Sequence, residues 1–173
     1  MKRACSLLAA AALALPLGAQ PFTFDLTYLE SKASNTLGIS LTHSTLQFAA
    51  RFLDGKDPEE AQVKKLIEGI ESITIKSFEF KTAGTWAQAD VDKLRNQLHP
   101  PEWSRMVGYK SAEEGETAEV YVREVEKKVA GVAIIDAEPK ELTVVSIVGS
   151  IDLDSLAELS GHFGVPKLEG KHK

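Results

Sequence analysis

The most continuous hydrophobic pattern in the chain, outside its first twenty residues, is a pair of apolar runs separated by a short polar turn. The runs cover residues 129–135 and 142–148, and the turn between them is Ala137-Glu138-Pro139-Lys140-Glu141. Both runs are rich in β-branched residues at successive positions, which is typical of interior strands covered on two sides. The pattern therefore predicts a β-hairpin in the middle of a sheet. A short amphipathic helix is expected after it, capped by Asp152.

Four further segments have strand-like apolar alternation. They cover residues 37–41, 72–80, 103–109 and 118–123. Because the last four strands of the chain are joined by short turns, they predict an antiparallel meander.

Two of these strands carry more specific expectations. In 72–80, Ile73 and Ile75 share one face while Phe78 and Phe80 share the other. That change of phase predicts either a bulge near Ser77 or cover on both faces. In the strand over 118–123, polar residues alternate with apolar ones, which predicts one solvated face carrying Glu119, Tyr121 and Arg123.

Helix signals cluster in the first half of the chain. The spacing predicts a helix over 25–34 capped by Asp25, and a helix over 46–53 behind a capping box of Ser44 and Gln47. The next helix begins at Asp57-Pro58 and is expected to bury the side chains Val63, Leu66, Ile67 and Ile70. Another, over 91–98, stops at His99-Pro100-Pro101.

This segregation of helices and strands predicts an α+β fold. We expect a mostly antiparallel sheet of about five to six strands, with a C-terminal four-strand meander, packed by four to five helices. The length of 173 residues and the hydrophobic share of 43% suit one domain.

The first residues have the pattern of a secretory signal peptide. Lys2 and Arg3 precede a short apolar run over 7–15, which Pro16 ends before a small-residue site. The run is shorter than the roughly 20 residues that span a bilayer. We therefore predict a signal peptide over 1–19, cleaved before Gln20. A single domain over 20–173 follows, with a polar tail over about 167–173.

The single cysteine and the net charge limit the cellular location and the partners that we expect. The sole cysteine, Cys5, precedes the apolar run, where it cannot serve as a lipobox, so we expect a periplasmic or secreted chain with no stable membrane anchor. Cleavage would change the formal charge from −5 to −7, because Lys2 and Arg3 are lost. An acidic domain is a poor candidate for binding nucleic acid.

The stretch IIDAEPKELTVVSIVGSIDLDSLAELSGHFGVPKL resembles family 4252 of the bacterial domains of unknown function. The matching elements are the apolar strand, Glu-Pro-Lys-Glu-Leu at the turn, the Val-Gly-Ser-Ile-Asp-Leu junction and the Leu-Ala-Glu-Leu helix. A weaker upstream pattern extends the resemblance over most of the mature chain. It implies a small exported envelope protein, and it implies no activity.

Candidate chemistry is sparse. Asp152 and Asp154 could form an oxygen-rich cation loop, but capping of the last helix by Asp152 is the favoured interpretation. The four histidines, at positions 43, 99, 162 and 172, lack zinc-ligand spacing. Gly131, Gly149, Gly161 and Gly164 form no phosphate-binding loop. We thus predict no metal and no cofactor.

Two other sets of residues are candidates for a site, a hydrolytic triad and an aromatic patch. Ser146 or Ser160 could combine with His162 and Asp136 as a hydrolytic triad, although no G-x-S-x-G elbow is present. The aromatic residues Trp86, Trp103 and Tyr109 could form a ligand patch, with Trp103 better explained as a core or edge residue of its strand.

The favoured function is a non-catalytic exported envelope protein that binds or scaffolds a protein partner, in one variant within envelope signalling. An open sheet edge, such as the strand over 37–41, would receive a partner strand. The alternative is a small periplasmic hydrolase or ligand-binding protein with a site near 149–154 and His162. The sequence leaves the oligomeric state open.

Overall fold

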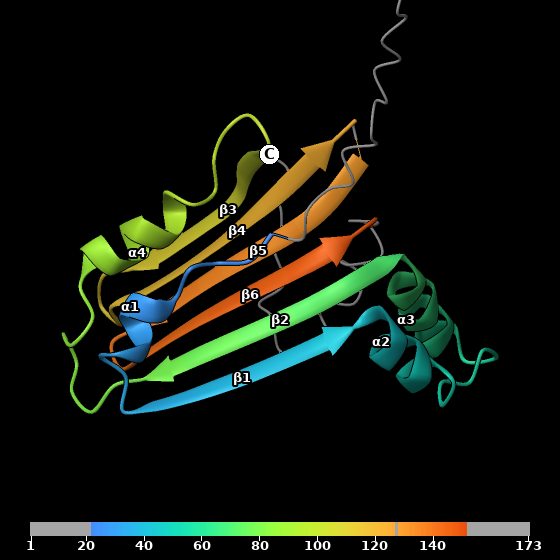
Figure 1. Ribbon diagram of the computed structural model, residues 1–173, viewed down its shortest axis with the longest axis horizontal. Coiled ribbons are helices and arrows are strands. Elements are labelled where there is room, and N and C mark those ends of the chain that lie inside the picture. Colours follow the sequence, from blue (N-terminus) through green and yellow to red (C-terminus); the bar gives the residue numbers. More distant parts are fainter. Residues whose placement is uncertain (1–21, 127, 152–173) are drawn as a thin grey trace, which may run out of the picture.

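The computed structural model describes residues 22–126 and 128–151. The predicted signal peptide, the predicted last helix and the polar tail lie outside these residues. Six strands form a single antiparallel sheet in the order β1-β2-β6-β5-β4-β3, and four helices accompany it (Figure 1). The predicted α+β class and antiparallel sheet are confirmed. Within the described part of the chain, no helix is both long and apolar enough to cross a membrane.

The elements follow one another along the chain as α1, β1, α2, α3, β2, α4 and then four strands. Their bounds are α1 Thr27–Glu30, β1 Asn35–Thr42, α2 His43–Ala50, α3 Pro58–Gly69, β2 Ile70–Glu79, α4 Gln88–Arg95, β3 Trp103–Ser111, β4 Glu116–Val125, β5 Lys128–Glu138 and β6 Glu141–Gly149.

The last four strands form the predicted C-terminal meander, in which each strand pairs with its successor. The β5–β6 hairpin turns through Pro139 and Lys140 alone. β2 then pairs with the outer side of β6, and β1 with the outer side of β2. The hairpin predicted to be central therefore provides the two middle strands of the sheet, β6 and β5.

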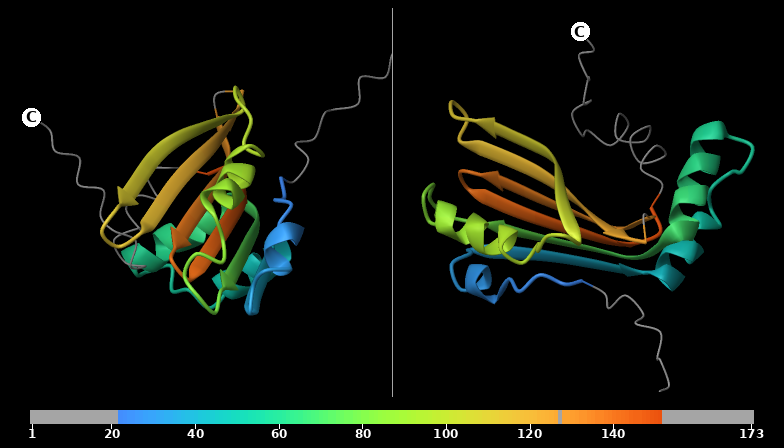
Figure 2. Two further views of the ribbon diagram at one scale, coloured as in Figure 1. Left: turned by 90° about the vertical axis from the view of Figure 1, so that its left-hand side faces the viewer. Right: turned by 90° about the horizontal axis from the view of Figure 1, so that it is seen from above.

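One face of the sheet, the α4 face, carries the larger core. The segment 22–26, α1 and α4 all lie on this side (Figure 2). They cover large buried side chains of the strands and of the helices themselves, which include Leu29, Phe78, Leu94, Ile135 and Leu142. Burying one such side chain contributes about 1.5–3 kcal/mol, so this layer dominates the stability of the domain.

The opposite face, the α3 face, is lined by smaller aliphatic side chains. Val122, Val132 and Ile151 are its buried cluster, and Leu66 of α3 packs against them. α3 stands at one end of the sheet on this side, next to α2 (Figure 2). Most of the other apolar residues on this face are half-buried.

Two local expectations were wrong, and of the two alternatives for β2, cover on both faces is the one observed. The helix predicted over 25–34 is only the single turn α1, because residues 22–26 run extended along the core instead. The cap of α2 is Thr42, whose Oγ1 accepts the Thr45 N–H, rather than Ser44. β2 pairs regularly through Ser77; its register shift lies at Ile70–Ser72. The change of phase instead reflects apolar residues on both faces.

The helix α3 begins as predicted but buries less than expected. Asp57 caps it by accepting N–H groups from Glu59 and Glu60 through Oδ1. None of its own residues is fully buried: Val63, Leu66 and Ile67 are half-buried, and the buried Ile70 belongs to β2. The helix sits at the end of the sheet, where only one of its sides meets the core.

The face of β4 predicted to be solvated is buried. Glu119 is 3% exposed and Tyr121 is 9% exposed, because this side of β4 lies in the layer that α4 covers. Arg123 is half-buried and is paired with Glu102. The residues Ala118, Val120 and Val122 lie on the α3 face instead.

Candidate functional site

β1 forms one free edge of the sheet. Within the described residues it pairs with β2 alone, in an unbroken register from Asn35↔Glu79 to Thr42↔Ser72. Its sequence, NTLGISLT, contains neither a charged residue nor a proline, and seven of its eight residues are exposed. A strand edge of this kind presents backbone N–H and C=O groups in the geometry that a further strand requires.

The side chains of β1 differ between its two faces. Leu37 and Ile39, which lie on the α3 face, are 57% and 38% exposed. Gly38 and Ser40 lie on the α4 face, where the Lys76 side chain passes close to Gly38: a Cβ there would meet Nζ at 3.2 Å. An added strand would therefore meet apolar residues on one side and small or polar residues on the other.

Two contacts fix the end of β1. Thr42 ends the strand and caps α2, so the chain turns away from the sheet at once. His43 then contacts the Ile70 carbonyl oxygen through Nδ1 at 2.7 Å. His43, one of the four histidines that lack zinc-ligand spacing, thus links the start of α2 to the start of β2.

The other edge, β3, is built differently. It carries Arg105 and Lys110, and its pairing with β4 shifts register between Arg105 and Val107. Charges and bulges are the features by which natural sheets discourage pairing with further strands. The two edges are therefore not equivalent, and β1 is the one suited to accept a strand.

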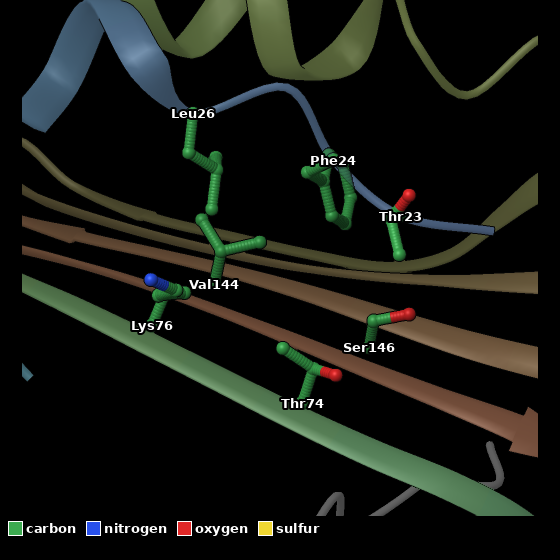
Figure 3. A pocket seen from close by; sticks show the side chains of 7 residues that line it. All are labelled: Thr23, Phe24, Leu26, Thr74, Lys76, Val144 and Ser146. Atoms are coloured by element: carbon green, nitrogen blue, oxygen red, sulfur yellow. The ribbon is translucent and has the colours of Figure 1, made fainter. Parts of the chain in front are cut away.

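A shallow cavity lies on the α4 face next to β1. Its volume is about 170 Å³, and it opens between the segment 22–26 and the strands β2 and β6 (Figure 3). Its lining residues are Thr23, Phe24, Leu26, Thr74, Lys76, Val144 and Ser146. Small-molecule sites commonly enclose about 300–1,000 Å³. The cavity is too small and too poor in convergent polar groups to favour a small-molecule site.

A buried ionic cluster lies beneath α4. Glu119 accepts hydrogen bonds from Arg95 Nε at 2.7 Å and Nη2 at 3.1 Å, from Arg105 Nη1 at 3.0 Å and from the Tyr121 hydroxyl at 3.1 Å. Burial acts to raise the pKa of Glu119, but these hydrogen bonds and the charge of Arg95 outweigh it and hold the pKa below its usual value. Each of the two carboxylate oxygens of Glu119 thus accepts two hydrogen bonds. The cluster therefore fixes α4 on the sheet rather than offering a reactive group.

A second buried carboxylate connects α1 to α4. Asp90 Oδ2 accepts the Ala87 N–H at 2.9 Å, which caps α4, and both of its oxygens lie within 2.8 Å of Lys32 Nζ. Burial alone would raise the pKa of Asp90, but Lys32 and the cap lower it. Beside it, burial followed by the charge of Asp90 raises the pKa of Tyr28 to about 12. This group too is structural.

The described residues do not bring the predicted triad together. Ser146 lies on the α4 face, where its Oγ donates to the Phe22 carbonyl at 3.4 Å. Asp136 lies on the α3 face, opposite Thr143. Ser160 and His162 are outside the described residues, as are Asp152, Asp154, His172, Gly161 and Gly164. In the described part of the chain, no three His, Cys, Asp or Glu residues are grouped so as to hold a metal.

The junction at Gly149 is closely packed. A Cβ at Gly149 would meet the Gly69 carbonyl oxygen at 2.3 Å, and its φ is 146°, so glycine is required there by both space and backbone conformation. Gly131 is also tight: a Cβ there would lie 3.2 Å from the Ile147 carbonyl oxygen. These glycines serve packing of strands. The described half of the alternative site, 149–151, is thus closely packed against the end of α3 and the start of β2 at Gly149.

The aromatic residues do not form one patch. Trp103 is 6% exposed and belongs to the core, as predicted, and Trp86 packs against the same core while donating to the Glu138 carbonyl at 2.8 Å. Tyr109 is on the opposite face and is 50% exposed. Sequence reasoning missed the Glu119–Arg95 pair, because Glu119 stands in a strand of alternating polar and apolar residues, the pattern of a strand with one solvated face.

Known proteins and protein families provide a separate line of evidence. No curated protein matches the chain. A family model does match, over residues 28–159, so that the match includes every described strand and extends beyond the last of them. The chain belongs to the family described as a domain of unknown function (DUF4252).

Proposed function

We propose that this chain is a non-catalytic, exported envelope protein that binds a protein partner by accepting a strand at β1. The observation that supports the proposal most is the contrast between the edges: β1 is uncharged, regular and exposed, whereas β3 is charged and bulged. Strand addition gives affinity through backbone hydrogen bonds and specificity through alternate side chains. Scaffolding and envelope signalling are both processes that such a surface would serve.

The surface defines the chemistry of the partner. A strand next to β1 would place apolar side chains beside Leu37 and Ile39 on the α3 face. On its other face, small or acidic side chains would fit beside Gly38 and near Lys76. The Lys76 ammonium group lies 3.6 Å from a Glu30 carboxylate oxygen, and both side chains are partly exposed. We therefore expect a partner segment with alternating aliphatic and small or acidic residues.

A matched pair of edge variants tests the proposal. Leu37 and Met106 are 57% and 56% exposed on β1 and β3, so Leu37→Lys and Met106→Lys make the same change at opposite edges. Both variants should fold, because substitutions at exposed positions change stability by about 0.5 kcal/mol or less. Partners captured from envelope extracts by the wild-type mature chain should be lost with Leu37→Lys and retained with Met106→Lys.

Hydrogen exchange would then locate the contact. A captured partner should slow exchange of the amides of 35–42 in the complex and leave those of 103–111 unchanged. Equal capture by both variants, or protection confined to β3, would contradict the proposal. The export half is tested separately: a mass spectrum of the chain from the envelope should show it beginning at Gln20 and carrying no lipid.

A further inference from the structure

An apolar row crosses the α3 face from one edge of the sheet to the other. The pairing registers place Ile39, Ile75, Val145, Ile134, Val120 and Val107 next to one another, one from each strand. All six are β-branched. An antiparallel sheet that faces water on one side normally alternates polar residues onto that side. An unbroken row of Ile and Val indicates instead that this face is covered.

The chain itself leaves the sheet on this face. Ile151, the last described residue, is 7% exposed and packs against Val122 and Val132 of β4 and β5. Its N–H donates to the Val129 carbonyl oxygen at 3.0 Å, which fixes its position beside β5. Ile151 therefore lies on the apolar surface at the β4–β5 side of the sheet, and the sequence continues from this point.

The sequence after Ile151 has the pattern of an amphipathic helix, with one apolar side that suits packing on a sheet. Leu153, Leu156, Ala157 and Phe163 recur at helical spacing, while Asp154, Ser155 and Glu158 occupy the other side of that pattern. The family match also continues through residue 159, beyond the last strand. The segment is therefore matched as part of the domain and not as a tail.

We infer that residues 153–163 of this same chain pack on the α3 face over β4, β5 and β6. In helical form about ten residues extend about 15 Å, which is the width of about three strands spaced about 4.8 Å apart. Such a segment reaches from Ile151 across half the sheet. It stops short of β1, in agreement with the exposure of Leu37 and Ile39, which are 57% and 38% exposed.

This arrangement divides the α3 face into two parts with different occupants. The part over β4–β6 is covered by the chain's own C-terminal segment. The part over β1 and β2, which includes Leu37 and Ile39, stays uncovered by this segment and adjoins the free edge of the sheet. The inference does not depend on the proposed function, because it concerns the surface over β4, β5 and β6 and not the edge strand β1.

Methyl NOEs in the mature chain test the packing directly. We expect NOEs from Leu153 and Leu156 methyl groups to those of Val132, Ile134 and Ile147. A sample that mixes labelled and unlabelled chains distinguishes packing within one chain from packing of a second copy. In such a sample, NOEs between labelled and unlabelled groups arise only from contacts between two chains. Absence of these NOEs, or their appearance between chains, would overturn the inference, the latter by assigning the face to a second copy.

A pair of substitutions gives a second measurement. Leu156→Asp should lower the melting temperature by about 10 °C, since it buries an unpaired carboxylate against aliphatic strands. Ser155→Asp, on the other side of the helical pattern, should change it by no more than about 2 °C. Equal shifts for the two variants would contradict packing of the Leu156 side on the sheet.

Discussion

Two carboxylates on opposite faces of the sheet illustrate how differently the faces are built. Glu119 of β4 points to the α4 face, where two arginines and a tyrosine bind it. Asp136 of β5 points to the α3 face, where burial, together with the charges of Glu116 and Glu141, raises its pKa. The fold thus favours the ionised form of the first carboxylate and disfavours the ionised form of the second.

The aliphatic residues follow the same division. The α4 face is covered by α1, α4 and the segment 22–26, and its large apolar strand residues, such as Phe78, Ile135 and Leu142, are completely buried. On the α3 face, the strand residues next to them in sequence are mostly half-buried. One layer thus supplies most of the stability, and the other is packed less closely, both at the free edge and where we infer that the C-terminal segment covers it. Four substitutions test this difference.

The largest effect is expected from adjacent isoleucines of β5. Ile135, on the α4 face, is 0% exposed, whereas Ile134, on the α3 face, is half-buried. Ile135→Ala should lower the free energy of unfolding by about 3–4 kcal/mol, because a cavity is left in a closed layer. Ile134→Ala should cost about 1–2 kcal/mol. Urea unfolding of both variants measures the difference.

The matched design makes the outcome decisive. The two residues have the same side chain, in the same strand, one position apart, so propensity and backbone effects cancel. Equal losses of stability would mean that the α3 face is as closely packed as the α4 face, and the contrast between the faces would fail.

A somewhat smaller effect is expected from Glu119→Gln. Gln keeps the shape but cannot neutralise Arg95 and Arg105, so we expect a loss of about 2–3 kcal/mol at pH 7. The pH dependence identifies the cause. The pKa of Glu119 lies below its usual value of 4.5 in the folded chain, so its contribution is complete above pH 4.5 and lost as the pH falls through the folded pKa.

The variant should therefore unfold with a flatter dependence on pH below 4.5 than the wild type. Some dependence should remain in both, because the pKa of Asp90 is also lowered in the fold. If Glu119→Gln is as stable as the wild type at pH 7, the cluster does not hold α4 on the sheet.

Alternation of apolar residues was sufficient to predict the strands and their order in the meander. The two apolar runs that open the sequence analysis became β5 and β6, and the short turns forced their neighbours to pair in succession. The strand over 37–41 was named as an example of an open edge, and β1 does lie at an edge of the sheet, although the sequence left the full strand order open.

Alternation could not show what covers each face. It assigned Glu119 to solvent because a carboxylate opposite valines normally faces water. The residue that reverses this, Arg95, lies 24 positions away on α4, and its approach depends on tertiary packing. The same limit applies to α1, where contacts of the extended segment 22–26 with the core replaced the helix that local spacing predicted.

The smallest effect, and the one of opposite sign, is expected from Asp136→Asn. Burial, followed by the charges of Glu116 and Glu141, raises the pKa of Asp136 in the fold. The ionised form of Asp136 therefore destabilises the fold at neutral pH. This loss of stability disappears as the pH falls through the folded pKa toward the usual 3.8. Asn removes the charge, so we expect a gain of up to about 1 kcal/mol at pH 7 and none at pH 3. Chemical unfolding at the two pH values measures it. A loss at pH 7 would show that the carboxylate is held by hydrogen bonds, as Glu119 is, and that the two faces treat a strand carboxylate alike.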